Sequence, residues 1–277
     1  MSATSLVDFS RLCLHTITTK PWSLQECVEN YVKAGIPAIT VWRNALESLG
    51  LAESARLLKS SGLRVTSLCR GGFFPATTAT ARAKALDDNH RAIEEAQAIG
   101  APHIVLVVGA VPGIPLPDAR KMIADGIAAV LPEAKAAGVK LAIEPLHPMY
   151  ANDRSAVNTM KQANDMVAYI GSPLVGVAVD VYHLWWDDTL EQEIIRCGQV
   201  GALMAFHVCD WRTPTREFLN DRGLMGEGCI NIPQIRSWVE AAGFNGDIEV
   251  EIFSTELWAT DQHQFVDRIK KAYLASA

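Results

Sequence analysis

Four ionisable side chains in the second half of this 277-residue sequence stand at, or directly after, the end of an apolar run. They are Glu144, Asp180, His207 and Glu251. Three carboxylates packed together would repel one another and raise one another's pKa unless a cation neutralised them. Carboxylate oxygens with one imidazole suit Mn²⁺ or Mg²⁺, with Mn²⁺ preferred, and Co²⁺ or Zn²⁺ are tolerated. These residue types predict a divalent-metal site, provided that the fold brings them together.

The equivalent positions of the four residues favour a shared site over four unrelated ones. Any one of them alone could cap a loop or form a surface ion pair, but four in consecutive structural units point to a metal. In the last run, Glu249 and Glu251 face the same way. Glu251 is preferred as the ligand because it lies nearer the end of the run, and Glu249 would then lie one layer lower.

Eight short runs of apolar and β-branched residues are the predicted strands that must position these side chains. They span 12–17, 38–42, 64–69, 103–108, 140–144, 175–180, 203–208 and 248–252. Each interval leaves room for a helix, and Ser23 and Glu26 have the spacing of a capping box. Helix-ending glycines are expected at Gly35, Gly62, Gly100, Gly138, Gly171 and Gly243.

Eight such strand–helix units predict an α/β fold, a single (β/α)₈ TIM barrel that spans residues 1–277 as one domain. In this fold the chemistry collects at the carboxyl ends of the strands, where the four candidate ligands stand. A doubly wound open sheet is the alternative. It is less favoured because no G-x-G-x-x-G sequence follows the first strand.

Composition and charge argue against several classes of function. The 25 Lys and Arg residues against 31 Asp and Glu residues give a net charge of −6, so a basic nucleic-acid-binding face is not expected. No apolar run approaches the ~20 residues of a membrane span, and no signal-peptide pattern begins the chain, so a cytoplasmic location is expected. The six cysteines form no C-x-x-C pair, which disfavours a zinc ribbon or a thioredoxin-like site.

The order and spacing of these motifs resemble the xylose isomerase-like TIM-barrel superfamily, the sugar phosphate isomerase/epimerase group with the AP endonuclease family 2 fold. The motifs are Glu144 after its strand, the D-x-x-H of Asp180 and His183, F-H at 206–207, G-E-G-C-I-N-I-P at 226–233 and V-E-I-F at 250–253. The resemblance spans nearly the whole chain. It implies that Glu144, Asp180, His207 and Glu251 are the metal ligands, and that Glu144 and Glu251 are also the catalytic acid/base pair.

Proton transfer next to a carbonyl is the chemistry that such a site would perform. Deprotonation gives an enediolate, whose negative charge a divalent cation stabilises. Return of the proton to the same carbon is epimerisation, and return to the neighbouring carbon is isomerisation. The expected protein is a metal-dependent isomerase or epimerase whose partner is a small keto-sugar or polyol.

Two other functions stay open at this point. Loss of a β-hydroxyl from the same intermediate would make the protein a dehydratase or eliminase of a keto-sugar or keto-inositol, similar to inosose dehydratases. A non-catalytic carbohydrate-binding barrel is less favoured because no ligand is missing. Neither nucleic acid nor membrane is an expected partner, whereas a homo-oligomer stays open because some of the tryptophans could form subunit contacts.

Five further residues near the ends of strands are expected to contact the substrate. They are His15, Arg70, His183, Arg212 and Trp186. The resemblance implies a contact with a substrate oxygen for His183 and for an arginine soon after the seventh strand, where Arg212 is preferred to Arg216. The indole of Trp186 offers an apolar face on which a sugar could stack.

Two features limit what the resemblance says about the substrate. The endonuclease branch would need extra histidine ligands, whereas the third and fourth strands are followed by Arg70 and Gly109. The segment EPLHP that begins at Glu144 differs from the EPLN or EVLN typical of epimerases. Whether the substrate is phosphorylated stays open, since Arg70 or Arg154 could bind phosphate.

Overall fold

A closed barrel of eight parallel strands forms the centre of the structure, a computed structural model that describes residues 5–277. The strands are β1 (Leu12–His15), β2 (Ala38–Trp42), β3 (Arg64–Gly72), β4 (His103–Val107), β5 (Lys140–Ile143), β6 (Val175–Asp180), β7 (Leu203–Val208) and β10 (Ile248–Val250). The barrel closes between the first and last of these, with Leu12 opposite Ile248. The predicted (β/α)₈ barrel is confirmed, and every predicted strand begins at the expected residue.

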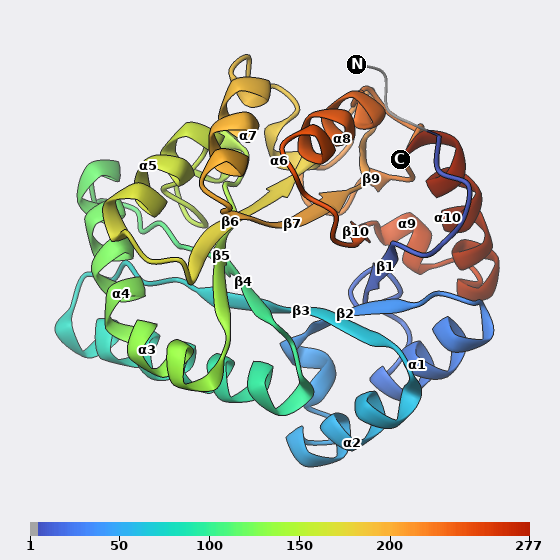
Figure 1. Cartoon of the computed structure of the whole chain (residues 1–277), viewed down its shortest axis with the longest axis horizontal. Coiled ribbons are helices and arrows are strands. Elements are labelled where there is room, and N and C mark those ends of the chain that lie inside the picture. Colours follow the sequence, from blue (N-terminus) through green and yellow to red (C-terminus); the bar gives the residue numbers. More distant parts are fainter. Residues whose placement is uncertain (1–4) are drawn as a thin grey trace.

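Helices surround the barrel on all sides (Figure 1). They are α1 (Leu24–Lys33), α2 (Leu51–Ser61), α3 (Ala79–Ile99), α4 (Leu116–Ala137), α5 (Met160–Ile170), α7 (Leu190–Gln199), α8 (Ile232–Ala241) and α10 (Gln262–Ser276). Short elements fill the connections: η1 (Arg43–Leu46), η2 (Pro148–Tyr150), α6 (Val181–Leu184), α9 (Thr255–Trp258) and the hairpin β8 (Asp210–Trp211) with β9 (Arg222–Gly223). No helix among residues 5–277 is long and apolar enough to cross a membrane.

The local signals in the sequence produce the expected helix ends. Ser23 accepts a hydrogen bond from the backbone N–H of Glu26, whose side chain accepts one from the N–H of Ser23, so the capping box is complete. All six predicted helix-ending glycines have a positive φ, between 65° and 97°. Each of these glycines lets the chain turn where a helix ends, so that the next strand of the barrel can begin.

Small side chains inside the barrel leave room for polar ones. Ala142, Ala178 and Ala205 project into the interior from three neighbouring strands, where they pack with Cys69 and Val105. The larger apolar core lies between the strands and the surrounding helices. The interior can therefore accommodate imidazole and carboxylate side chains near its axis.

Some strands end at a different residue from the one predicted, and two of these differences determine where candidate ligands lie. β5 ends at Ile143 and β10 at Val250, so Glu144 and Glu251 each stand one residue beyond a strand. β1 and β4 also end earlier than predicted. β3 runs on to Gly72, because its last residues pair with β4 across a shift in register.

Candidate metal centre and active site

The structure brings the four predicted ligands together at the carboxyl end of the barrel. Glu144, Asp180, His207 and Glu251 are all buried, and each offers one ligand atom within 4.8 Å of those of the others. They come from β5, β6, β7 and β10, which are consecutive neighbours around the barrel. These four residues are called the upper layer below.

The burial and the donor atoms of the upper layer are suited to binding a divalent cation. Asp180 Oδ2 is buried without a hydrogen-bond partner among the described residues, which is costly for a carboxylate oxygen. Burial raises the pKa of Asp180 to about 7; the charge of Arg222 opposes this shift, and the carboxylates of Glu251 and Glu144 add to it. Three carboxylates and one imidazole form a donor set suited to a hard or borderline divalent ion.

Arg222 is the principal basic partner of these carboxylates. Its side chain is buried, and Nη1 donates to Glu251 Oε2 at 2.9 Å and lies 3.5 Å from Asp180 Oδ2. The guanidinium carbon lies 4.2 Å from the ring centre of Tyr182 and 4.9 Å from that of Phe253. Aromatic faces and carboxylates together hold this arginine in place.

Sequence reasoning did not select Arg222, although it expected an arginine from this part of the chain. Three arginines follow β7, and Arg212 was preferred. A long-range contact brings Arg222 to the cavity: its N–H donates to the carbonyl of Phe253 at 3.0 Å, which ties β9 to the chain after β10. Nothing local in the sequence shows this tether. The substrate contact of Arg212 stays a prediction.

A second polar set lies beneath the upper layer. Glu249, His15, Thr40 and Ser67 form this lower layer, in which Glu249 Oε2 accepts hydrogen bonds from Thr40 Oγ1 (2.5 Å) and Ser67 Oγ (3.2 Å). The same oxygen lies 3.1 Å from His15 Nε2, and Glu249 Oε1 lies 3.8 Å from His207 Nε2. Burial opposes the charge of Glu249, but His207 and His15 outweigh it and lower the pKa to about 2.

His15 bridges the two layers. Its Nε2 faces Glu249 and its Nδ1 lies 3.1 Å from Glu251 Oε1. Burial opposes the charged imidazolium, but these two carboxylates raise the pKa of His15 to about 9. Its side chain is fully buried and does not belong to the cavity lining, and its predicted contact with substrate stays a prediction.

His183 stands at the edge of the upper layer as a neutral imidazole. Burial, with the charge of Arg222, holds its pKa well below the usual range. Nδ1 accepts a hydrogen bond from the N–H of His147 at 3.3 Å, and Nε2 lies 3.6 Å from Asp180 Oδ2. The predicted contact of His183 with a substrate oxygen stays a prediction.

A cavity of about 90 Å³ lies over the upper layer. It is lined by Trp42, Arg70, Val107, Glu144, Leu146, Tyr150, Arg154, His183, Leu219, Arg222, Glu251 and Phe253. The two carboxylates predicted as an acid/base pair thus border the same cavity. Of the five predicted substrate residues, Arg70 and His183 belong to its lining.

Arg212 and Trp186 lie outside this lining. Arg212 forms ion pairs with Glu227 and Glu256, each at 3.2 Å. The indole N–H of Trp186 donates to the carbonyl of His183 at 2.8 Å, which fixes the ring beside the site. The aromatic members of the lining are Trp42, Tyr150 and Phe253.

The loop 212–221, between β8 and β9, covers part of the cavity. The hydroxyls of Tyr150 and Tyr182 both donate to the carbonyl oxygen of Phe218, each at 2.9 Å. The next residue, Leu219, belongs to the cavity lining. Two tyrosines on different elements therefore hold one loop over the site.

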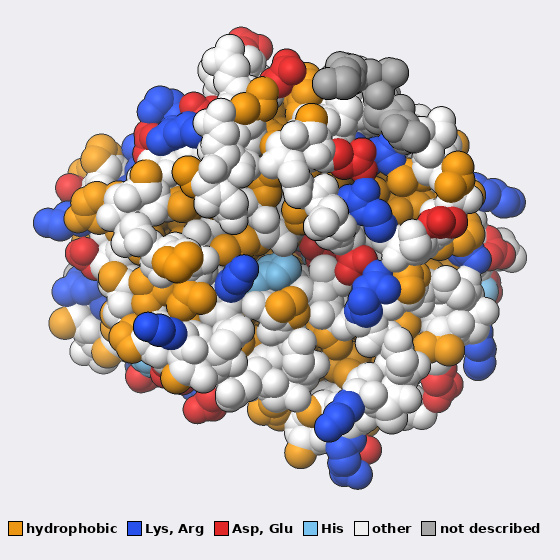
Figure 2. All heavy atoms as spheres, in the orientation of Figure 1, with side chains coloured by type: hydrophobic (Ala, Val, Ile, Leu, Met, Phe, Trp, Pro, Cys, Tyr) orange, Lys and Arg blue, Asp and Glu red, His pale blue; other side chains and the backbone are white. Residues whose placement is uncertain are grey.

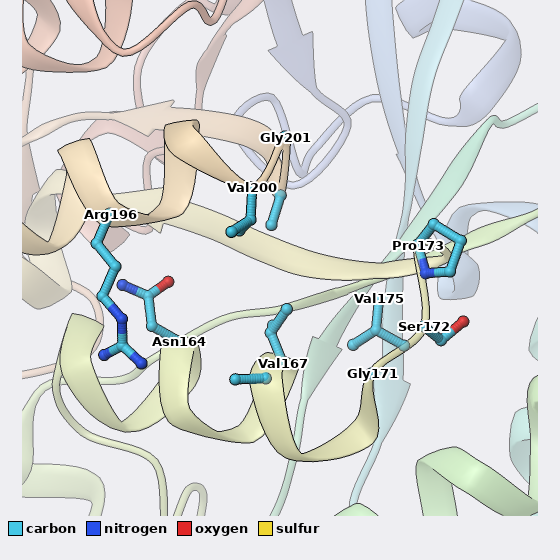
Figure 3. Close-up of a pocket in the computed structure, with 11 residues that line it drawn as sticks. Asn164, Val167, Gly171, Ser172, Pro173, Val175, Arg196, Val200 and Gly201 are labelled. Atoms are coloured by element: carbon cyan, nitrogen blue, oxygen red, sulfur yellow. The ribbon is translucent and has the colours of Figure 1, made fainter.

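A larger hollow lies at the opposite end of the barrel (Figure 3). It has a volume of about 360 Å³ and is bordered by Val167 of α5 and by Arg196 and Val200 near the end of α7. Val175, which begins β6, also lines it, whereas Asp180 ends the same strand, about 16 Å further on at 3.3 Å per residue. The larger hollow thus lies away from the candidate ligands, whereas the smaller cavity lies beside them.

Charged side chains are mixed on the face of the molecule in Figure 2. Acidic and basic groups alternate across this view, and no continuous basic field is visible on it. This face therefore lacks the basic stripe that a nucleic-acid backbone would require.

Fold and site together define a (β/α)₈-barrel protein with a carboxylate-rich candidate metal centre. Residues 28–269 match the family described as Xylose isomerase-like TIM barrel. The chain belongs to this family, as its motifs predicted.

Two curated relatives carry the name inosose isomerase. The protein from Bacillus velezensis is 24% identical over 278 residues, which cover 94% of this chain and 95% of the relative. The protein from Halalkalibacterium halodurans is 26% identical over 189 residues, and the match spans 64% of this chain and only 62% of the relative. These names support membership of an isomerase family.

Solved structures share the whole barrel. Protein SMc04130 from Sinorhizobium meliloti 1021 is 47% identical, with a TM-score of 0.94 over 98% of this chain and 99% of that one. IOLI protein, in a crystal structure with a bound zinc atom, is 21% identical, with a TM-score of 0.84 over 96% of this chain and 97% of that one. The 3-keto-D-glucoside 4-epimerase YcjR from E. coli is 20% identical, with a TM-score of 0.77 over 96% and 98%, respectively. The last two likenesses establish the fold.

Proposed function

We propose that this protein is a divalent-metal-dependent isomerase or epimerase of a small keto-sugar or polyol. The observation that carries the proposal is the position of Glu144 and Glu251, which both belong to the four-residue cluster and both border the 90 Å³ cavity. The isomerase names of the relatives support the same class of reaction.

Glu144, Asp180, His207 and Glu251 would hold the cation, for which Mn²⁺ is preferred. When bound, the cation would stabilise negative charge that develops on substrate oxygens. The fit rests on the unpartnered Asp180 Oδ2 and on the carboxylate-rich donor set. His207 is oriented for this role because its Nδ1 lies 3.0 Å from Glu144 Oε1, inside the cluster.

Glu251 is suited to accept a proton. Burial disfavours its charged form, but His15 and Arg222 outweigh burial and hold the pKa of Glu251 well below the usual range. The carboxylate is therefore ionised at neutral pH, which is the form that a general base needs. Its position beyond the end of β10 gives it access to the cavity.

Glu144 is the second proton-transfer group of the proposal. It stands beyond β5, and β7 and β6 separate that strand from β10 around the barrel. The two carboxylates therefore approach the cavity from different sides. Such an arrangement lets one group remove a proton from a substrate carbon and the other deliver a proton to the opposite face or to the neighbouring carbon.

The substrate would lie against Trp42 and Phe253, whose rings border the cavity. Aromatic faces pack on the C–H faces of a sugar and exclude water from the reacting carbons. His183 would contact a substrate oxygen beside the carboxylates. These residues bind and orient the substrate, whereas the acid/base pair moves the proton.

The test is hydrogen exchange in D₂O. Protein treated with a chelator and then reloaded with Mn²⁺ is incubated with a panel of ketoses and keto-inositols, and the products are followed by NMR. We expect deuterium at a stereocentre of at least one substrate, and loss of that exchange when the chelator is present. Release of water would instead identify a dehydratase, and failure to exchange with every substrate despite bound metal would contradict the proposal.

A further inference from the structure

Two arginines at the cavity form no ion pair with a carboxylate among residues 5–277. Arg70, near the end of β3, and Arg154, between η2 and α5, both line the cavity over the upper layer. Among residues 5–277 neither guanidinium forms an ion pair or donates a hydrogen bond to a side chain. The third arginine of the lining, Arg222, is paired with Glu251 at 2.9 Å.

The two guanidinium groups are close enough to repel each other. Burial, together with the charge of Arg154, lowers the pKa of Arg70, and the carboxylates of Glu144 and Glu251 oppose this shift without reversing it. Two like charges beside one cavity repel each other, and an anionic ligand bound between the two guanidinium groups would relieve that repulsion. A site that keeps this arrangement is already complementary to a negative group.

The backbone and aromatic rings hold the two arginines in place. The guanidinium carbon of Arg70 lies 4.5 Å from the ring centre of Phe73, and that of Arg154 lies 5.1 Å from the ring centre of Tyr150. The carbonyl of Arg154 accepts a hydrogen bond from the N–H of Gly109 at 2.9 Å. Stacking on rings and this tether reduce the conformational entropy that ligand binding would otherwise cost.

The carboxylates of the cavity are already committed to other partners. Glu144 contacts His207 at 3.0 Å, and Glu251 contacts both His15 and Arg222. They form the floor of the cavity, where the proposed proton transfer takes place. The two unpaired arginines are thus available for a part of the substrate that does not react.

We propose that Arg70 and Arg154 bind an anionic group of the substrate, a phosphate monoester or a carboxylate attached to the keto-sugar. This inference rests on the proposed function and names its substrate class. Planar guanidinium groups bind either anion through paired hydrogen bonds. The substrate would then differ from a neutral inosose, after which the curated relatives are named.

The first test measures anion binding without turnover. Chelator-treated protein is titrated with inorganic phosphate and, separately, with glycolate, and binding is followed by calorimetry. The variants are Arg70→Met and Arg154→Met, which keep an apolar side chain of similar length. The matched control is Arg82→Met, because Arg82 is exposed and its side chain donates to the Ala76 carbonyl rather than to a carboxylate.

We expect one of the two anions to bind to the wild-type protein and to bind about tenfold to hundredfold more weakly to each cavity variant. The control should bind like the wild type. Arg70→Lys, which keeps the charge but loses the planar fork, should fall between wild type and Arg70→Met. The proposal is overturned if neither anion binds, or if the cavity variants bind as well as the control.

The second test compares substrates in the D₂O assay. A neutral keto-sugar, its phosphate ester and the corresponding keto-acid are offered to the Mn²⁺-loaded protein. We expect a kcat/KM about a hundredfold higher for one anionic substrate, mainly through a lower KM, and a loss of this preference in the Arg70→Met and Arg154→Met variants. Which anionic substrate is preferred distinguishes phosphate from carboxylate.

The two proposals fail in different ways. Exchange with the neutral sugar that equals exchange with both anions would overturn the anion site and leave the isomerase function intact. Absence of exchange with every substrate would contradict the isomerase function, while the phosphate and glycolate titrations would still decide whether the arginines bind anions.

Discussion

The upper and lower layers of the barrel interior both combine carboxylate and imidazole side chains, but they differ in the groups that contact the carboxylates. In the lower layer, Thr40, Ser67 and His15 complete the contacts of Glu249. In the upper layer, Asp180 Oδ2 is buried and accepts no hydrogen bond among the described residues; its nearest basic group is Arg222 Nη1, at 3.5 Å. A carboxylate whose hydrogen bonds the protein completes supports the structure, whereas a carboxylate oxygen without a hydrogen bond, in a residue with a ligand atom within 4.8 Å of three others, is available to a cation.

Glu249 and Glu251 are only two positions apart, yet one belongs to the lower layer and the other to the upper layer. Glu249 lies within β10 opposite His207, and Glu251 lies one residue beyond the strand, where its N–H donates to the Val208 carbonyl at 3.2 Å. A shift of two positions moves a carboxylate from an enclosed network to the edge of the cavity. The following substitutions separate the two layers.

The largest effect is expected for Glu251→Gln in the upper layer. Glutamine keeps the shape of the side chain but cannot accept the proton, so kcat for exchange in D₂O should fall about 10²- to 10⁴-fold. The control is Glu94→Gln, on the exposed side of α3, which should exchange like the wild type. A greater loss of exchange in Glu249→Gln than in Glu251→Gln would reverse the assignment of the layers.

Arg222→Met tests whether the upper layer depends on positive charge. Removing one partner of a buried ion pair should lower the free energy of unfolding by about 3–5 kcal/mol, measured by urea denaturation of chelator-treated protein. Addition of Mn²⁺ should restore more stability to this variant than to the wild type, since the cation would supply the missing charge. Equal stabilisation of both proteins would argue against a cation among these carboxylates.

Glu249→Gln in the lower layer should weaken metal binding rather than stop proton transfer. Glu249 lies beneath His207 and His15, and loss of such an outer partner typically costs about 10- to 100-fold in metal affinity. Titration with Mn²⁺, followed by electron paramagnetic resonance, measures this affinity. At saturating Mn²⁺ most of the exchange activity should return, which no variant of the proposed base would show.

The smallest effect is expected for Ser67→Ala. The hydroxyl of Ser67 donates one of several contacts to Glu249 at 3.2 Å, and its loss should lower the free energy of unfolding by about 1 kcal/mol. Thermal and urea unfolding measure the change. A loss of metal affinity as large as that of Glu249→Gln would contradict this ranking, because the hydroxyl would then matter to the upper layer as much as the carboxylate.

The strands and the candidate ligands could be predicted because their signals are local. Each apolar run is one strand, and the residue at its carboxyl end faces the same end of the barrel as its neighbours. The positions of Glu144 and Glu251 follow from this rule alone. The choice between Glu249 and Glu251 followed from height along the strand, and the structure places them at the two expected levels.

Residues in the loops could not be selected in this way. Arg222 reaches the carboxylates through a backbone contact with Phe253, and Arg212 instead joins an ion-pair cluster with Glu256. Trp186 is fixed by a hydrogen bond to the carbonyl of His183. Such positions depend on tertiary contacts between segments distant in sequence. The identity of the metal, a single domain, a cytoplasmic location and a homo-oligomer stay predictions.

The double contact of Tyr150 and Tyr182 with Phe218 has a consequence for kinetics. The cavity of about 90 Å³ is smaller than the ~300 Å³ at which pockets for typical ligands begin, and Leu219 of the loop 212–221 belongs to its lining, so we expect substrate entry to displace this loop. Both hydroxyl contacts must then break before entry and re-form afterwards. We expect this opening, on a microsecond to millisecond timescale, to set an upper limit on turnover even when proton transfer is faster.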